Sequence, residues 1–229
     1  MQHPDEKQFQ TKLTKQEYLL LESKAKIRSE FVAGRIFAMT GASQRHNTIV
    51  VNIAAAFHSK LKGSPCRVFV NDLKVHVEKN DCFYYPDVMV VCEKLDGSAV
   101  YTSTPSLIVE VLSRSTWMID KREKLLTYRT IDSLQEYLLV HQSKKMLELH
   151  RRNTKGEWET QQLTENSAEA AVTLQSVLPG EFQLSFDAIY DGVELSDQEK
   201  NKGHVKEETA DYSCFADIEF CEPLENLEW

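Results

Sequence analysis

The chain has 229 residues, of which 41% are hydrophobic and 27% charged, a balance typical of a globular protein with one sizeable core. It contains no apolar run long enough to span a bilayer, and residues 1–12 lack the apolar core of a signal peptide. The formal net charge of −8 excludes a protein that binds nucleic acid through overall positive charge. We therefore expect a soluble, cytoplasmic protein.

The negative charge is concentrated at the C-terminus. Residues 196–229 hold ten acidic and three basic residues, whereas the other 195 residues hold 25 acidic and 24 basic. We predict a domain at 1–195 and a flexible acidic tail at 196–229, because the tail is charged and poorly periodic. The domain is nearly neutral, so a local basic rim and a bound metal would still allow it to bind DNA.

The cysteines carry little information about a site. They are odd in number and lack the spacing of metal ligands, which favours reduced thiols over a disulfide framework or a zinc site. The five residues are Cys66, Cys82, Cys92, Cys214 and Cys221.

The N-terminal part predicts, in chain order, a helix at 15–23, a hairpin at 30–39 and a helix at 43–61. Thr14 and Glu17 fit a capping box for the first helix. Ala33 and Gly34 fit the turn of the hairpin. The second helix follows from apolar residues at helical spacing, and Gly63 is expected to end it.

The rest of the chain predicts mainly strands. The middle has strands at 67–77, 83–92 and 106–112, a loop at 93–105 and a basic helix at 119–128. A hairpin at 136–151, an edge strand at 158–163, a closing strand at 172–178 and a short helix at 182–190 follow. This order predicts a mixed α/β (α+β) fold with helices flanking one sheet.

Two carboxylates lie in or beside strands that are predicted to be buried. Asp87 follows Pro86 at the start of an apolar run, and Glu110 lies within the next one. A buried charge is costly unless it is paired or binds a metal, and Mg²⁺ prefers carboxylate oxygens. Neighbouring strands would bring both acids to one metal site. The alternatives are a turn acid at Asp87 and an ion-paired carboxylate at Glu110.

The helix after the second acid supplies a candidate cation. Lys124 lies one turn after Asp120, on the same helix face. If the helix packs on the preceding strand, this ammonium can orient water or stabilise negative charge at the two acids. The alternative is a solvated, charged helix face.

The order Pro-Asp, an acid in an apolar strand, and a lysine resembles the PD-(D/E)XK nuclease superfamily, and more closely the Uma2 family of restriction-type endonucleases. The matching stretches are Glu30–Ile36, Ser43–His46, Tyr85–Val90, Ile108–Ser113, Ser115–Thr116, Asp120, Lys124 and Glu136–Val140. The likeness covers about residues 14–190 and leaves out the tail. It implies a restriction-endonuclease-like core with a mixed sheet flanked by helices.

The resemblance implies catalytic roles for Asp87, Glu110 and Lys124. It also implies that Glu30 joins Asp87 and Glu110 as a ligand of Mg²⁺ or Mn²⁺. The superfamily pattern has a lysine two positions after its second acid, where this chain has Leu112. In families of this kind the lysine is thought to come from the following helix, which would make it Lys124.

Four further residues receive weaker assignments. The resemblance makes His46 a site-lining residue, although a cap or packing role is the alternative. Asp120 is expected to orient Lys124 or Arg122 through an ion pair. Lys121 and Arg122 would contact the DNA backbone or form a solvated face.

The leading hypothesis is therefore a magnesium-dependent endonuclease that hydrolyses DNA phosphodiester bonds. Leu112 and the acidic tail motivate a competing hypothesis, a catalytically inactive nuclease-fold protein that binds nucleic acid or serves in assembly. A third idea is that the tail mimics nucleic acid and covers the site. Analogy with folds that act on both DNA strands favours a homodimer.

Overall fold

The computed structural model describes residues 12–39, 41–113, 117–167, 171–176 and 182–195. Its helices are α1 (Lys15–Glu22), α2 (Gln44–Lys60), α3 (Trp117–Ile119), α4 (Leu125–Tyr128) and α5 (Phe186–Tyr190), with a 3₁₀ turn at Glu78–Asn80 and a π-helical turn at Asp120–Lys124. No helix within these ranges is long and apolar enough to cross a membrane. The predicted tail at 196–229 lies outside the described residues.

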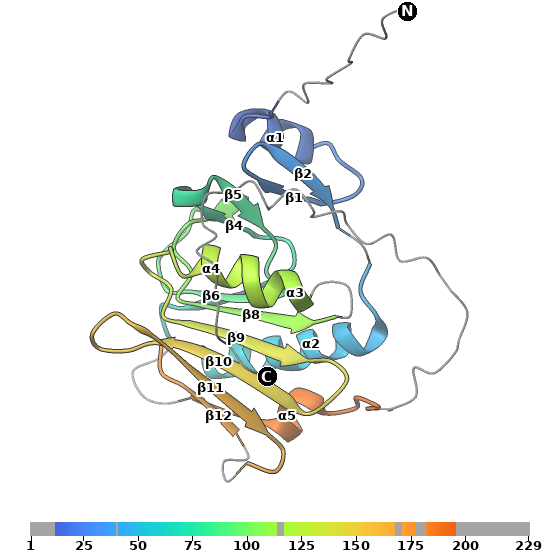
Figure 1. Ribbon diagram of the computed structural model, residues 1–229, viewed down its shortest axis with the longest axis vertical. Coiled ribbons are helices and arrows are strands. Elements are labelled where there is room, and N and C mark those ends of the chain that lie inside the picture. Colours follow the sequence, from blue (N-terminus) through green and yellow to red (C-terminus); the bar gives the residue numbers. More distant parts are fainter. Residues whose placement is uncertain (1–11, 40, 114–116, 168–170, 177–181, 196–229) are drawn as a thin grey trace, which may run out of the picture.

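Two large sheets and a short hairpin carry the fold (Figure 1). The five-stranded sheet has the order β2 (Arg35–Ala38), β1 (Ser29–Val32), β5 (Cys82–Tyr84), β4 (Lys74–Val77) and β7 (Tyr101–Thr102). The six-stranded sheet has the order β11 (Trp158–Thr164), β10 (Met146–Arg152), β9 (Glu136–His141), β8 (Leu107–Leu112), β6 (Val88–Val91) and β3 (Arg67–Val70). The hairpin pairs β12 (Ala171–Leu174) with β13 (Phe182–Ser185). The expected mixed α/β fold is confirmed, but with two main sheets.

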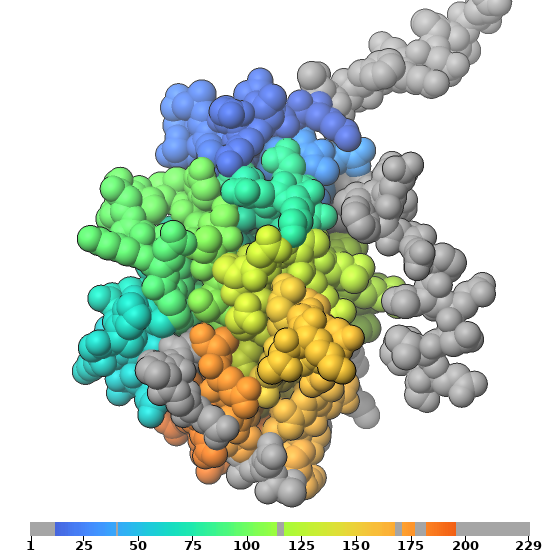
Figure 2. Space-filling view, turned by 90° about the vertical axis from the view of Figure 1, so that its left-hand side faces the viewer, coloured from blue at the N-terminus to red at the C-terminus, as the bar shows by residue number. Residues whose placement is uncertain are grey.

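Helices cover both faces of the six-stranded sheet (Figure 1). On one face α2 buries Ile49, Ile53 and Phe57 against the strands. On the other face α4 buries Tyr128 against a second core, which includes Tyr137. The N-terminal helix and hairpin lie at one end of the molecule and α5 at the other (Figure 2). Strands β6 and β8 therefore lie between two helical layers (Figure 1).

Several predicted strands are wrong in their boundaries. The stretch 67–77 is two strands, β3 and β4, in different sheets, because Asn71 takes a positive φ of 52° and turns the chain. The stretch 83–92 is also two strands, β5 and β6, separated at Pro86, which lacks a ladder donor. The expected loop at 93–105 contains β7, and the expected helix at 182–190 begins as β13.

The capping box and the hairpin turn are confirmed, whereas α2 ends at Lys60 with Leu61 as its C-cap, before Gly63. Thr14 caps α1, and Glu17 returns a hydrogen bond to the Thr14 main-chain N–H at 2.8 Å. The hairpin turn has positive φ at Ala33 and at Gly34. A Cβ atom on Gly34 would lie 2.6 Å from the Cβ of Lys12, so glycine is required for both conformation and space.

The expectation of reduced cysteines is wrong for two of the five. Cys66 and Cys92 form a disulfide between the start of β3 and the end of β6. The β3–β6 register pairs Arg67 with Val91, so the next residues outward face each other directly. Cys82 is a buried free thiol. Cys214 and Cys221 lie outside the described residues.

Candidate active site

The candidate site lies where the two large sheets meet. The chain leaves β5 in one sheet, passes through Tyr85, Pro86 and Asp87, and enters β6 in the other. Strand β8 lies beside β6 and pairs Val109 with Val88. Asp87 and Glu110 are therefore next to each other at the start of β6, as neighbouring strands would require.

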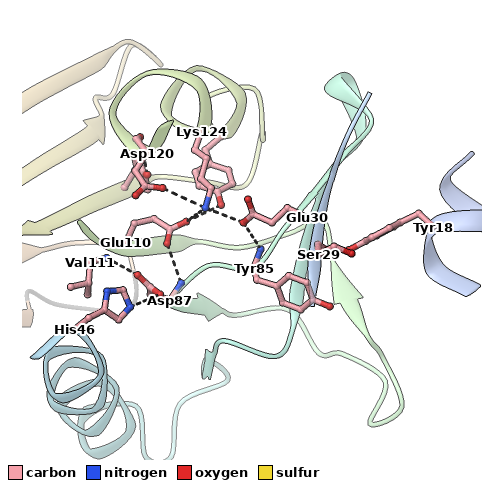
Figure 3. A network of polar contacts seen from close by, with 12 residues as sticks. Tyr18, Ser29, Glu30, His46, Tyr85, Asp87, Glu110, Val111, Asp120 and Lys124 are labelled. Atoms are coloured by element: carbon pink, nitrogen blue, oxygen red, sulfur yellow. Dashed lines mark hydrogen bonds and ion pairs between the residues drawn. The ribbon is translucent and has the colours of Figure 1, made fainter. Parts of the chain in front are cut away.

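The two acids are connected through the main chain (Figure 3). The Asp87 N–H donates to Glu110 Oε2 at 3.2 Å, and the Val111 N–H donates to Asp87 Oδ2 at 2.7 Å. Glu110 thus accepts from the residue just before β6, and Asp87 accepts from a residue on β8. This reciprocal arrangement ties both side chains to the main chain of the two neighbouring strands.

Lys124 is the centre of the charged cluster (Figure 3). Its Nζ lies 3.0 Å from Glu30 Oε1, 3.3 Å from Glu110 Oε1 and 3.4 Å from Asp120 Oδ1. All four residues are buried, with Lys124 only 7% exposed. Burial alone lowers the pKa of Lys124, but the carboxylates, Glu110 first, hold that pKa well above its ordinary value. The lysine is therefore a charged bridge between the two sheets.

Asp120 and Lys124 both face the site because they lie four residues apart, about one turn along the helix. Residues at this spacing share one side of a helix. Asp120 and Lys124 are the two ends of the π-helical turn, and both are buried against the sheets. Turns of this kind occur frequently at functional sites.

Tyr128 is a site residue that the sequence analysis did not identify. Its hydroxyl donates to Glu110 Oε1 at 3.1 Å, and its ring packs edge-on against Tyr84 and Tyr137. Burial raises the pKa of Glu110 well above its ordinary value; the ammonium of Lys124 opposes this rise, and the nearby carboxylates add to it. The sequence did contain a signal for this role: Tyr128 lies four residues after Lys124, so the two side chains share one face of the helix.

His46 contacts the other acid. Ser43 caps α2 by accepting from the His46 N–H at 3.2 Å, which fixes the first turn of the helix. The His46 Nε2 lies 3.0 Å from Asp87 Oδ1. Burial lowers the pKa of His46, but the hydrogen bond and charge of Asp87 outweigh it, so the net shift is upward. The structure therefore places His46 at the side of the site opposite Lys124.

Of the remaining residues assigned from the sequence, one belongs to the charged cluster and the others do not. Glu30, on β1, also accepts from the Tyr85 N–H at 3.3 Å, so it belongs to the cluster. Leu112 is buried in the core beneath α4 and does not join it. Lys121 points to Glu148 at 2.7 Å, away from the cluster. Arg122 is exposed.

The donor set suits one divalent cation held by two carboxylates. Among the described residues, no group of three His, Cys, Asp or Glu side chains converges closely enough to hold an ion. The Glu30, Asp87 and Glu110 set is therefore divided, with Lys124 between Glu30 and Glu110. Mg²⁺ needs only one or two carboxylates, because it keeps several waters and binds substrate phosphate. The four acidic side chains, Glu30, Asp87, Glu110 and Asp120, outnumber the two basic side chains that contact them, Lys124 and His46.

The sequence matches the Uma2 family, described as "Putative restriction endonuclease", over residues 15–187. This chain belongs to the Uma2 family. The match spans every residue of the cluster, from Glu30 to Tyr128. It does not reach the acidic tail.

Two relatives and one solved structure extend this result. The uncharacterized protein sll1609 of Synechocystis sp. is 34% identical over 168 residues, which cover 72% of this chain and 95% of that protein. The uncharacterized protein slr1290 of the same organism is 35% identical over 148 residues, which cover 64% of this chain and 78% of that protein. The crystal structure of "a putative nuclease belonging to DUF820" from Anabaena variabilis superposes with a TM-score of 0.62 at 17% identity. That alignment covers 78% of this chain and 98% of the other, and it shows a shared restriction-endonuclease-like fold.

Proposed function

We propose that this Uma2 protein is a metal-dependent endonuclease that hydrolyses DNA phosphodiester bonds. The observation that carries the proposal is the meeting of Asp87 and Glu110 on neighbouring strands, 3.2 Å apart from main-chain nitrogen to carboxylate, beside the Lys124 ammonium. The family description and the fold of the Anabaena protein support a nuclease. The DNA substrate is inferred from the family description, and the metal is inferred from the paired carboxylates.

Asp87 and Glu110 would hold Mg²⁺ or Mn²⁺. When bound, such an ion lowers the pKa of a water and stabilises the charge that builds up on the phosphate. The carboxylates lie on adjacent strands of a rigid sheet, so their separation is fixed before any ion binds. This preorganisation is what a phosphoryl-transfer site requires.

The other residues of the cluster would orient the side chains that contact the metal or the substrate. Lys124 would donate to a phosphate oxygen or to the attacking water, and Glu30 fixes its direction from the second sheet. Tyr128 orients Glu110 through its hydroxyl. His46 orients Asp87 from the opposite side. Each of these contacts restricts one side chain that reaches the substrate or the metal.

Cleavage of plasmid and linear DNA by the full-length chain, with millimolar Mg²⁺ or Mn²⁺, tests the proposal. We expect nicking that chelation abolishes, and a loss of about a hundredfold or more in Asp87→Asn and Glu110→Gln. Asp132→Asn is the matched control, because Asp132 is an exposed acid that pairs with Lys79. Equal cleavage by wild type and Asp87→Asn would show that this cluster is not the active site.

One observation favours the second candidate, a nuclease-fold protein that binds nucleic acid without cleaving it. The Lys124 ammonium already lies between two of the acids, so the cluster is partly neutralised without an ion. Calorimetry separates the two functions. DNA binding by a folded chain that takes up no Mg²⁺ or Mn²⁺ at millimolar concentration, and cleaves nothing, would favour this candidate.

A further inference from the structure

A second buried carboxylate lies in the same row of the six-stranded sheet as Glu110. In the strand register, Glu110 on β8 faces Leu139 on β9, and Leu139 faces Glu148 on β10. Directly opposed residues point to the same face of a sheet, so Glu110 and Glu148 both point toward the helix that covers this face. One apolar side chain separates the two acids.

The covering segment, residues 117–128, reaches both acids with lysines. Lys124 Nζ lies 3.3 Å from Glu110, and Lys121 Nζ lies 2.7 Å from Glu148 Oε2. These lysines are three residues apart and belong to the same π-helical turn. The segment is therefore attached to the sheet at two charged points, two strands apart.

Apolar packing of this segment against the second core comes from Tyr128 and the partly buried Leu125. The buried side chains of segment 117–128 are Asp120, Lys124 and Tyr128, and the first two are charged. The large apolar side chains of Met118 and Leu126 are 49% and 54% exposed. Ion pairs and hydrogen bonds, more than a hydrophobic stripe, therefore decide how the segment is rotated on the sheet.

Glu148 is itself held firmly. His150 Nε2 lies 2.9 Å from Glu148 Oε1, and the Gln162 side chain donates to Oε2 at 3.3 Å. His150 is in turn 2.8 Å from the Thr160 hydroxyl. Burial raises the pKa of Glu148, but the hydrogen bonds from His150 and Lys121 outweigh it and lower that pKa to about 2. The carboxylate is thus a fixed, ionised anchor on the sheet.

We propose that Glu148 is a positioning residue, which acts through Lys121 to fix the rotation of segment 117–128 and thereby hold Lys124 between Glu30 and Glu110. Its catalytic meaning rests on the proposed nuclease function, but its structural effect on Lys124 does not. Lys124 touches the cluster, whereas Glu148 acts only through the helix. Loss of the Glu148 charge should therefore change the accessibility of Lys124 while leaving the sheet intact.

The test measures the acylation rate of individual lysines by mass spectrometry in the full-length chain. In Glu148→Gln and in Lys121→Met we expect Lys124 to react about tenfold faster, because a charge-assisted contact no longer holds the segment closed. The double variant should show no further increase, since both changes break the same contact. Lys121→Arg keeps the ion pair with Glu148, so Lys124 should be acylated as slowly as in the wild type.

One internal reference and one control variant exclude a general loosening of the fold. Lys74 is also 7% exposed, but it lies in the other sheet beside Tyr85, so its rate should not change. Lys145→Met removes a surface pair with Glu165 and should leave Lys124 unreactive. Unchanged Lys124 reactivity in Glu148→Gln, in a chain that melts normally, would overturn the proposal. So would an equal rise at Lys74.

Cleavage kinetics add a reading that a purely structural role would not give. If wild type cleaves DNA, Glu148→Gln should lower kcat about tenfold with little change in KM, because substrate binding does not involve this residue. A kcat equal to that of wild type would count against the proposal. If wild type does not cleave, the nuclease function fails, and the Lys124 acylation rates alone decide the role of Glu148.

Discussion

Asp87 and Glu110 are joined by a hydrogen bond from the main chain of one to the side chain of the other, with Asp87 N 3.2 Å from Glu110 Oε2. The return contact, from the Val111 N–H to Asp87 Oδ2 at 2.7 Å, uses the residue after Glu110. The geometry of the pair is therefore set by the β6–β8 register. A change of register would separate the acids and remove the site.

Replacing Lys124 by methionine should destabilise the protein and make it more responsive to Mg²⁺. The change leaves Glu30, Glu110 and Asp120 buried without their ammonium, which costs about 3–5 kcal/mol. A divalent cation can replace the missing charge, so millimolar Mg²⁺ should raise the melting temperature of Lys124→Met more than that of wild type. Thermal unfolding with and without the ion measures both effects.

Lys145→Met serves as the control for the Lys124 substitution, because it removes a partly exposed lysine from a surface pair. Its melting temperature should change little and should respond to Mg²⁺ as wild type does. Identical Mg²⁺ responses in Lys124→Met and wild type would argue against metal binding by these carboxylates.

Replacing Tyr128 by phenylalanine should reduce both the stability of the protein and its rate of cleavage. The hydroxyl is the donor that orients Glu110 Oε1 at 3.1 Å, and its loss costs about 1.5–3 kcal/mol, the range for a hydrogen bond to a charged group. Misorientation of Glu110 should lower kcat between about ten- and a hundredfold. Denaturant unfolding and cleavage kinetics give the two numbers.

Tyr18→Phe is the matched comparison for Tyr128→Phe. Tyr18 is also fully buried and donates to the Ser29 carbonyl at 2.7 Å, but that contact lies away from the charged cluster (Figure 3). We expect it to lower stability with unchanged kcat. If both variants lose activity equally, the Tyr128 hydroxyl has no specific role.

The need to protonate His141 on unfolding should make the protein less stable in mild acid than at neutral pH. Burial, with the positive charges of Lys144 and Lys121, lowers its pKa to about 4, against an opposing effect of Glu148. The unfolded chain binds the proton near pH 6.5, so protonation favours unfolding as the pH falls through the window from about 6.5 to about 4.

The urea midpoint, measured near neutral pH and again near pH 4.5, gives this dependence. His141→Gln cannot titrate, so its midpoint should fall less over the same interval. A variant that loses as much stability as wild type would show that other groups cause the acid sensitivity.

Reduction of the Cys66–Cys92 disulfide should lower stability. The bond joins residues 26 apart, and closing a loop of this size contributes about 3 kcal/mol. Urea unfolding with and without dithiothreitol measures the difference. The double variant Cys66→Ser, Cys92→Ser should be insensitive to dithiothreitol, and an insensitive wild type would mean that the bond does not form in solution.

The sequence was most informative where local chemistry decides the structure. The capping box at Thr14 and Glu17 and the turn at Ala33–Gly34 depend on neighbouring residues, and both are present. Asp87 and Glu110 stood out because charges within apolar runs need a partner. Their convergence required only that two consecutive strands pair side by side.

The sequence did not predict which strands share a sheet or how the helix packs against them. The breaks at Asn71 and Pro86 are visible as irregularities, but not the fact that the chain changes sheets there. Tyr128 has the spacing of a packing residue, so its hydrogen bond to Glu110 depends on how the helix docks. The disulfide depends on the β3–β6 register, which places Cys66 opposite Cys92.

The change of sheets at Tyr85, Pro86 and Asp87 distributes the residues of the site over two sheets of the fold. The six-stranded sheet carries the pair Asp87 and Glu110, and the N-terminal hairpin contributes Glu30 through its contact with Lys124. The acidic pair therefore depends on the β6–β8 register and not on the hairpin. Among Uma2 proteins, we expect variation at the position of Glu30 to be tolerated where the position of Lys124 varies with it.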